Sequence, residues 1–193
     1  SAFPATKQEI QSLLLPKSHA AESQLPSSRV DYFYFINKKS QGLVDVHGNT
    51  IIPLTANQAI LPPSDNMLRL AKVEKKQIAK AYYDLDAEVM VRIPSSEKGK
   101  FGAFSHNLAP VSLDDELYFI DKKGNKVIGG LSKAFLSNEG YRVVQKGSAF
   151  GAIDSTGAVV IPIEYTNSLT SVNNGRLGVQ KNASWFYVDM KGQ

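Results

Sequence analysis

The chain has 193 residues, of which 42% are hydrophobic and 21% charged, and its formal net charge is +4. These values are ordinary for a soluble globular protein that forms one domain or a short repeat array. Cysteine is absent, which excludes disulfides and cysteine-ligated metals, and no apolar run approaches the roughly 20 residues of a membrane helix, so no membrane span is expected.

Residues 1–30 are expected to form a helix followed by a linker. Thr6 and Glu9 have the spacing of a capping box, which predicts a helix over residues 7–15. Residues 17–28 are rich in Ser, Pro and Ala, as linkers are. The chain starts without Met, and this segment resembles the spacer that often follows a cleaved leader. A periplasmic, secreted or surface-associated location is therefore expected, with a cytoplasmic one left open.

Residues 31–193 are expected to form a β-repeat domain, because one short motif recurs five times. Residues 42–53 align without a gap on residues 151–162. In four copies an aspartate is followed three residues later by glycine, a pairing typical of a type I turn with a bulge. The marker aspartates recur every 33 to 39 residues, at Asp45, Asp84, Asp121, Asp154 and Asp189.

A second turn-forming residue precedes four of these aspartates by fourteen positions, and a stretch with strand character follows it. These residues are Asp31, Asn107, Gly140 and Gly175. Each repeat is therefore expected to contain three short antiparallel strands, such as those over 141–145, 150–153 and 159–162. Pro53 and Pro162 cannot donate to a strand ladder, so they should end the third strand or lie at a sheet edge.

The predicted fold is all-β. It is an open, twisted array of about five short antiparallel repeats of hairpins or three strands, preceded by the short N-terminal helix. Each repeat would bury its apolar face only by packing on its neighbours. A closed, propeller-like arrangement is the alternative. The open array is favoured because propeller blades usually have four strands and about 40 residues or more.

Two stretches resemble the bacterial WG-repeat family. Residues 104–111, followed by Asp121, and residues 146–165 match its pattern F-S-E-G-L-A-x-V … G-Y-I-D-x-x-G-x-x-V-I-P. The resemblance covers about residues 31–193, and it implies an all-β fold, an exported or surface location and a binding role without catalytic residues. The Trp-Gly pair that names the family is altered at the matching sites, which are Gln41-Gly42, Leu117-Tyr118, Phe150-Gly151 and Trp185-Phe186.

Residues for catalysis or metal binding do not form a recognisable motif. The three histidines, His19, His47 and His106, are far apart and lack metal-ligand spacing. A nucleophile elbow and a phosphate-binding loop are also missing. Turn capping already explains the marker aspartates. The sequence therefore predicts that the protein is not an enzyme and binds no metal or cofactor.

Aromatic residues are the remaining candidates for a contact surface. Residues 32–35 and 185–187 are runs of consecutive aromatic residues, so both faces of each strand carry aromatic rings. These rings could fill the core and cover the ends of the array, or they could contact a peptide, a glycan or another chain. The candidate contact residues are Tyr32, Tyr34, Trp185 and Tyr187.

The sequence thus predicts a non-catalytic binding or scaffolding module that contacts a protein or a glycan and is associated with the bacterial envelope. The alternative is a structural piece of a larger repeat assembly that associates edge to edge, because the fifth copy stops before a third strand. Self-association through a terminal strand would follow from that alternative. Nucleic acid is not an expected partner, because no nucleic-acid-binding signature accompanies the aromatic residues.

Overall fold

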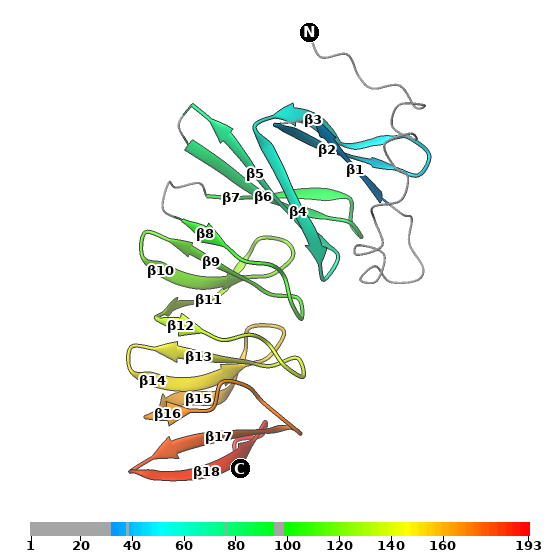
Figure 1. Ribbon diagram of the computed structural model, residues 1–193. Coiled ribbons are helices and arrows are strands. Elements are labelled where there is room, and N and C mark those ends of the chain that lie inside the picture. The colour runs from blue at the N-terminus through cyan, green and yellow to red at the C-terminus, as the bar shows by residue number, and fades with distance from the viewer. Residues whose placement is uncertain (1–31, 38, 76, 95–98) are drawn as a thin grey trace. The chain divides into compact units, whose positions relative to one another are not determined.

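The computed structural model describes residues 32–37, 39–75, 77–94 and 99–193. The N-terminal helix and linker expected over 1–30 lie outside the described residues. Within the described part, the chain forms strands and turns and no helix. The all-β prediction is therefore confirmed for these residues (Figure 1).

The described strands form five sheets, each with a linear order that does not close on itself, and three of these sheets have four strands and not the predicted three. The first sheet has the order β1-β2-β3, the second β4-β5-β6-β7, the third β11-β10-β9-β8, the fourth β12-β13-β14-β15 and the fifth β16-β17-β18. The strand bounds are β1 Tyr32–Asn37, β2 Ser40–Asp45, β3 Thr50–Ala56, β4 Gln58–Ser64, β5 Met67–Glu74, β6 Gln77–Asp84, β7 Val89–Ile93, β8 Lys100–Phe101, β9 Ala109–Leu113, β10 Glu116–Ile120, β11 Lys126–Leu131, β12 Lys133–Ala134, β13 Arg142–Lys146, β14 Ala149–Ile153, β15 Val159–Tyr165, β16 Asn167–Ser168, β17 Arg176–Lys181 and β18 Ser184–Asp189.

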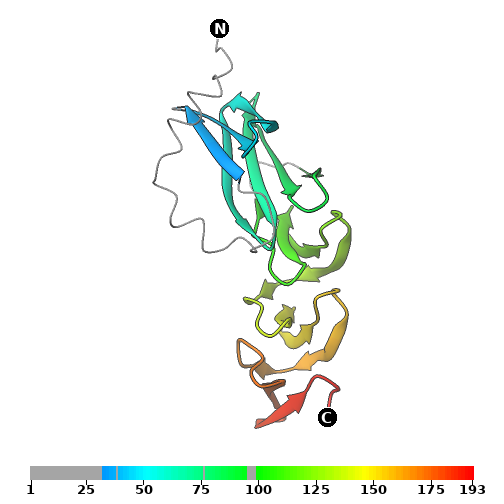
Figure 2. The same ribbon diagram turned by 90° about the vertical axis from the view of Figure 1, so that its right-hand side faces the viewer.

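The chain divides into two compact units, residues 1–90 and 91–193. The core of the first unit joins residues of its two sheets, namely Leu43, Ile52, Ile60, Leu68, Leu70, Tyr83 and Leu85. In the second unit the three sheets follow one another in chain order and end at β18, as two views of the ribbon show (Figures 1 and 2).

Successive sheets are joined by a single residue at three places. Asn57 lies between β3 and β4, Ser132 between β11 and β12, and Thr166 between β15 and β16. The backbone N–H of Ser132 donates to the carbonyl of Gln145 at 2.9 Å, and that of Thr166 donates to the carbonyl of Gln180 at 2.9 Å. The outer strand of one sheet therefore runs directly into the first strand of the next.

The marker turns have the predicted geometry. Asp154 Oδ1 accepts from the backbone N–H groups of Thr156 at 2.8 Å and Ala158 at 3.1 Å. Gly157 has φ +86°, a left-handed conformation that favours glycine, and its N–H donates to the Asp154 carbonyl. A register shift follows between Ala152 and Ile153, which is the expected bulge. The same backbone bonds close the turns that start at Asp45, Asp121 and Asp189.

Acid should weaken the fold through these aspartates. Desolvation alone would raise the pKa of Asp154, but hydrogen bonds from Thr156 and Ala158 lower it below the ordinary 3.8. The pKa values of Asp45, Asp121 and Asp189 are lowered too. Because each pKa is lower in the folded chain, this stabilisation is present above the unfolded pKa and is lost as the pH falls below about 4. Urea unfolding between about pH 6 and 3 measures the loss.

The variant Asp154→Asn should show a weaker acid dependence than the native chain, because it removes a carboxyl group whose pKa is lowered by folding. A curve for Asp154→Asn that runs parallel to the native one would contradict the role given to this turn.

The tight turns predicted fourteen positions before the marker aspartates are also present in the structure. Asn107, Gly140 and Gly175 each have positive φ, of 68°, 81° and 66°, whereas Asp31 lies outside the described residues. Each turn is closed by a pair of backbone hydrogen bonds, and the three pairs join Ser105 with Leu108, Asn138 with Tyr141, and Asn173 with Arg176. Two-residue turns of this kind suit tightly twisted antiparallel strands.

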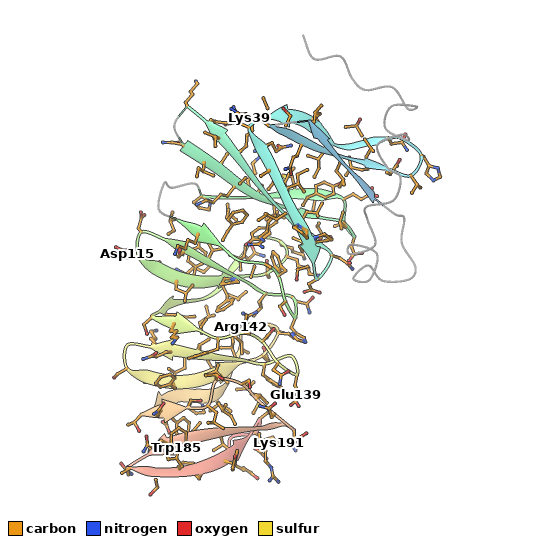
Figure 3. The ribbon with its side chains drawn as sticks, viewed as in Figure 1. Lys39, Asp115, Glu139, Arg142, Trp185 and Lys191 are labelled. Atoms are coloured by element: carbon orange, nitrogen blue, oxygen red, sulfur yellow. The ribbon has the colours of Figure 1, made fainter. Side chains whose placement is uncertain are left out.

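These tight turns also contact one another along the second unit. The Glu139 carboxylate accepts from the backbone N–H groups of Asn174 at 2.8 Å and Gly175 at 2.9 Å (Figure 3). The Asn138 amide donates to the Val172 carbonyl at 2.6 Å. Polar contacts between turns therefore help to hold successive repeats in register.

The two prolines occupy a position that the sequence predicts only in part. Pro53 and Pro162 lie on outer strands, β3 and β15, so the expected edge position is confirmed. They do not end these strands, which continue to Ala56 and Tyr165. Both lie in a bulge opposite a glycine of the neighbouring strand, between paired positions, where a residue without a backbone donor is tolerated.

Apolar cores form between successive sheets of the second unit. Phe119 of the third sheet packs in one cluster with Val144 and Ile153 of the fourth. Ala152 of the fourth sheet shares another cluster with Val179 of the fifth. The residue two places before a marker aspartate thus faces the next sheet, as expected for repeats that bury their apolar faces against neighbours.

Arg142 is a buried cation between the third and fourth sheets (Figure 3). It is 6% exposed, and its guanidinium lies 4.6 Å from the Phe119 ring. Its N–H groups donate to the carbonyls of Phe135 at 3.2 Å and Ser105 at 3.4 Å. Burial lowers the pKa of Arg142 to about 10, which leaves it charged at neutral pH. Carbonyl groups and an aromatic face solvate this charge.

Candidate contact surface at the last strand

The four candidate contact residues lie on two strands in different units. Tyr32 and Tyr34 belong to β1, where they pair with Asp45 and Leu43, and their side chains are outside the described part of the structure. Trp185 (Figure 3) and Tyr187 belong to β18, and both are exposed. The contact surface is therefore developed for β18.

Exposure at β18 departs from the pattern of the other repeats. Leu43, Phe119 and Ala152 stand two places before their marker aspartates, and each is 0% exposed. Tyr187 stands at the same position in the fifth copy and is 67% exposed. A position that is buried in three other repeats is thus open to solvent here.

Phe119 and Ala152 pack against the sheet that follows theirs, whereas no sheet follows the fifth among the described residues, so Tyr187 has no such neighbour. β3, β11 and β15 pair with β2, β10 and β14, whereas β18 pairs among the described strands with β17 alone. The turn after β18 is nevertheless complete. Asp189 Oδ1 accepts from the N–H groups of Lys191 at 2.9 Å and Gln193 at 3.0 Å. One edge of β18 therefore presents backbone donors and acceptors next to exposed aromatic rings.

We define the terminal aromatic patch as Leu169, Trp185 and Tyr187, the exposed side chains on one face of the fifth sheet. Leu169 and Tyr187 lie over Gly178, where an added Cβ would be 2.7 Å from Leu169 and 3.4 Å from Tyr187. The Phe186 ring meets the Tyr165 ring edge to face at 6.0 Å. Trp185 is 50% exposed and Phe186 41%. Side chains alternate along a strand, so Phe186 lies on the face of β18 opposite to Trp185 and Tyr187, which are open to solvent.

Histidine and serine side chains form one polar cluster in the second unit. His106 Nδ1 lies 2.9 Å from Ser137 Oγ, which lies 2.6 Å from Ser105 Oγ. The cluster joins two successive tight turns at the surface. His47 lies in a marker turn, and His19 lies outside the described residues. Among the described residues, no three His, Asp or Glu side chains are arranged to hold a metal ion.

The sequence points to Trp185 and Tyr187 but not to Leu169 and Phe186. Leu169 follows the two-residue strand β16, which has too few residues to give a periodic pattern. Phe186 could have been found, because the repeat alignment places it at the glycine position of the Trp-Gly pair.

Nothing among the described residues forms a helix that is both apolar and long enough to span a membrane.

Solved structures with a similar chain path include Hsv2 of Kluyveromyces lactis, at 14% identity and a TM-score of 0.42, covering 84% of this chain and 61% of that one. A form of that protein with loop 6CD replaced by a Gly-Ser linker has 13% sequence identity and a TM-score of 0.43, and the match covers 83% of this chain and 60% of that one. Hsv2 of Kluyveromyces marxianus has 13% sequence identity and a TM-score of 0.40, and the match covers 83% of this chain and 56% of that one. The chain spans about three fifths of the length of these structures.

No curated protein matches the chain in sequence. The family model for the WG containing repeat matches residues 150–185, from the second residue of β14 into β18. This segment contains the marker turn at Asp154 and the tight turn at Gly175, the two local structures on which the resemblance rests. This match confirms the predicted resemblance to the WG-containing repeat for residues 150–185.

Proposed function

We propose that this chain is a non-catalytic repeat module that binds another protein through the terminal aromatic patch. The observation that carries this proposal is the exposure of Tyr187 at a position that is fully buried in three other repeats. Trp and Tyr are the residue types that most often dominate protein interfaces. An association with the bacterial envelope belongs to the same proposal and is supported by the family resemblance alone.

The patch is large enough to matter energetically. An aromatic ring buries roughly 150–250 Å², and burial contributes about 25 cal/mol per Å². Trp185 and Tyr187 are 50% and 67% exposed. Covering both would contribute about 4–7 kcal/mol before the costs of association are subtracted. That is a substantial share of the binding energy of a micromolar complex.

Affinity capture from an extract of the source cells tests the proposal. The native chain is expected to retain a partner at near-stoichiometric amounts, and the double variant Trp185→Ala/Tyr187→Ala should lose most of it, because aromatic anchors carry most of the energy of such contacts. Leu136→Ala is the matched control, because Leu136 is 86% exposed in the same unit and outside the patch. Circular dichroism verifies that all three chains are folded. Equal retention by the native chain and the double variant would refute the proposed surface.

A structural role is the second candidate, and the uncovered edge of β18 favours it. Unpaired strand edges readily pair with another chain. In this case analytical ultracentrifugation would show the native chain self-associating without another protein, and the double variant remaining monomeric. A glycan remains the alternative ligand, because aromatic faces also offer a platform for sugar rings.

A further inference from the structure

The three tight turns of the second unit share one backbone geometry. In each turn the two flanking residues exchange a pair of backbone hydrogen bonds, and the N–H groups of the two central residues take no part in that pair. Both central residues have positive φ, as a two-residue type I′ turn requires. The values are 47° and 68° at His106 and Asn107, 52° and 81° at Glu139 and Gly140, and 50° and 66° at Asn174 and Gly175.

The last of these turns binds a carboxylate with both of its central N–H groups. Asn174 N–H donates to Glu139 Oε1 at 2.8 Å, and Gly175 N–H donates to Glu139 Oε2 at 2.9 Å. The two donors therefore match the two oxygens of one carboxylate, and hydrogen bonds to an ionised acceptor are stronger than those between neutral groups. This contact identifies the ligand that the shared backbone geometry accepts.

The preceding turn has the same pair of donors but a different residue opposite them. His106 is the first central residue of its own turn, as Glu139 is of the next one. An imidazole has no pair of oxygens to offer, and His106 Nδ1 lies 2.9 Å from Ser137 Oγ. Among the described residues, no group accepts a hydrogen bond from the backbone N–H of Glu139 or of Gly140. The donors that the last turn uses for a carboxylate are thus unused here.

The surroundings of this turn favour an anion that arrives from solvent. An added Cβ on Gly140 would lie 4.0 Å from His106 Cδ2, so the imidazole stands beside the turn. The guanidinium of Arg142 donates to the carbonyl of Ser105 at 3.4 Å, which brings a cation to the same joint. The carboxylate of Glu139 is held at the next turn, and both Glu139 and His106 are exposed. A ligand can therefore reach the two donors from outside.

We propose that the backbone N–H groups of Glu139 and Gly140 bind an acidic side chain of a partner protein. The partner's carboxylate takes the place, relative to this turn, that the Glu139 carboxylate takes relative to the next. A carboxylate is favoured over a phosphate because the occupant of the equivalent turn is planar and uses one oxygen for each donor. The site contains no residue of the terminal aromatic patch, so it goes beyond the proposed function and does not depend on it.

A nuclear magnetic resonance titration of the full 193-residue chain tests the site. The probe is N-acetylglutamate α-amide, its neutral counterpart is N-acetylglutamine amide, and sodium chloride keeps the ionic strength constant. We expect the amide proton resonances of Glu139 and Gly140 to move downfield and saturate with the acidic probe. Its affinity should exceed that of the neutral probe about fivefold or more, because the acceptor is charged.

Two results of this titration would overturn the inference. One is the absence of a saturable movement of the Glu139 and Gly140 resonances with the acidic probe. The other is a higher affinity of the same two amides for inorganic phosphate, which would make the ligand a phosphate and not an acidic side chain.

Variants at two positions exchange the occupancy of the turns. His106→Glu supplies an internal carboxylate to Glu139 and Gly140, so it should weaken their response to the probe about tenfold or more, whereas His106→Ala should retain the response. Glu139→Ala removes the internal carboxylate, so the amides of Asn174 and Gly175 should begin to respond. The dispersion of each spectrum verifies that the variant is folded. An undiminished response in His106→Glu, or silent amides at Asn174 and Gly175 in Glu139→Ala, would contradict the inference.

Discussion

Replacing Gly157 by alanine should lower the free energy of unfolding by about 2–4 kcal/mol, because two penalties add. Gly157 has φ +86°, in the left-handed region, where a side chain costs about 1 kcal/mol. An added Cβ would also lie 2.5 Å from Val127 Cγ2 and 2.7 Å from Val127 Cβ. Val127 belongs to the preceding sheet, so relief of the clash would separate two repeats. Urea denaturation followed by circular dichroism measures the change.

Gly147→Ala is the matched control for this prediction. Gly147 has φ +58° in the hairpin between β13 and β14, and an added Cβ there would meet nothing within 4 Å. It should cost about 1 kcal/mol, which is the conformational part alone. Similar losses for the two variants would show that the contact with Val127 does not hold the repeats together.

Arg142→Ala should cost about 2–4 kcal/mol, although no carboxylate among the described residues forms an ion pair with Arg142. The substitution removes the donors to two carbonyl groups and the cation beside the Phe119 ring, and it leaves a cavity between two sheets. Thermal and urea unfolding both measure the loss.

Two further variants separate the causes at this site. Arg142→Met retains most of the apolar packing without the charge, so it should lose less stability than Arg142→Ala if packing dominates. Arg176→Ala removes an exposed arginine of the same unit and should change the stability by less than about 0.5 kcal/mol. A loss for Arg142→Ala as small as that for Arg176→Ala would mean that the buried guanidinium is not an important link between the repeats.

The sequence predicts much of this fold because its turns are encoded locally. An aspartate that accepts nearby N–H groups and a glycine with positive φ need only five residues, and the marker turn at Asp154 has the predicted form. Strands between two such turns can be placed to within one or two residues. The predicted strand over 150–153, for example, is β14, Ala149–Ile153.

Features that depend on distant contacts could not be predicted in this way. The two-residue strands β12 and β16 have no pattern of their own and exist because they pair with β13 and β17. Pro162 reads as a strand terminator, but the bulge opposite Gly151 accommodates it within β15. Both features are consequences of register, which is set by tertiary pairing.

The candidate contact surface could likewise be predicted only where it depends on local sequence and not on distant contacts. An aromatic run marks Trp185 and Tyr187 as notable, but the sequence cannot decide whether such rings are buried. Burial at this position depends on a neighbouring strand and a following sheet, as Phe119 shows by being fully buried at the equivalent place.

The single-residue joints at Asn57, Ser132 and Thr166 constrain how the protein can vary in length. An insertion at a joint would displace a complete sheet from its neighbour, because the two strands on either side belong to different sheets. The two-residue hairpin at Gly147 lies at the surface and links strands of one sheet, so extra residues there would leave the stacking unchanged. Loops added during evolution or by protein engineering should therefore accumulate at the hairpin tips, while the spacing between sheets stays constant.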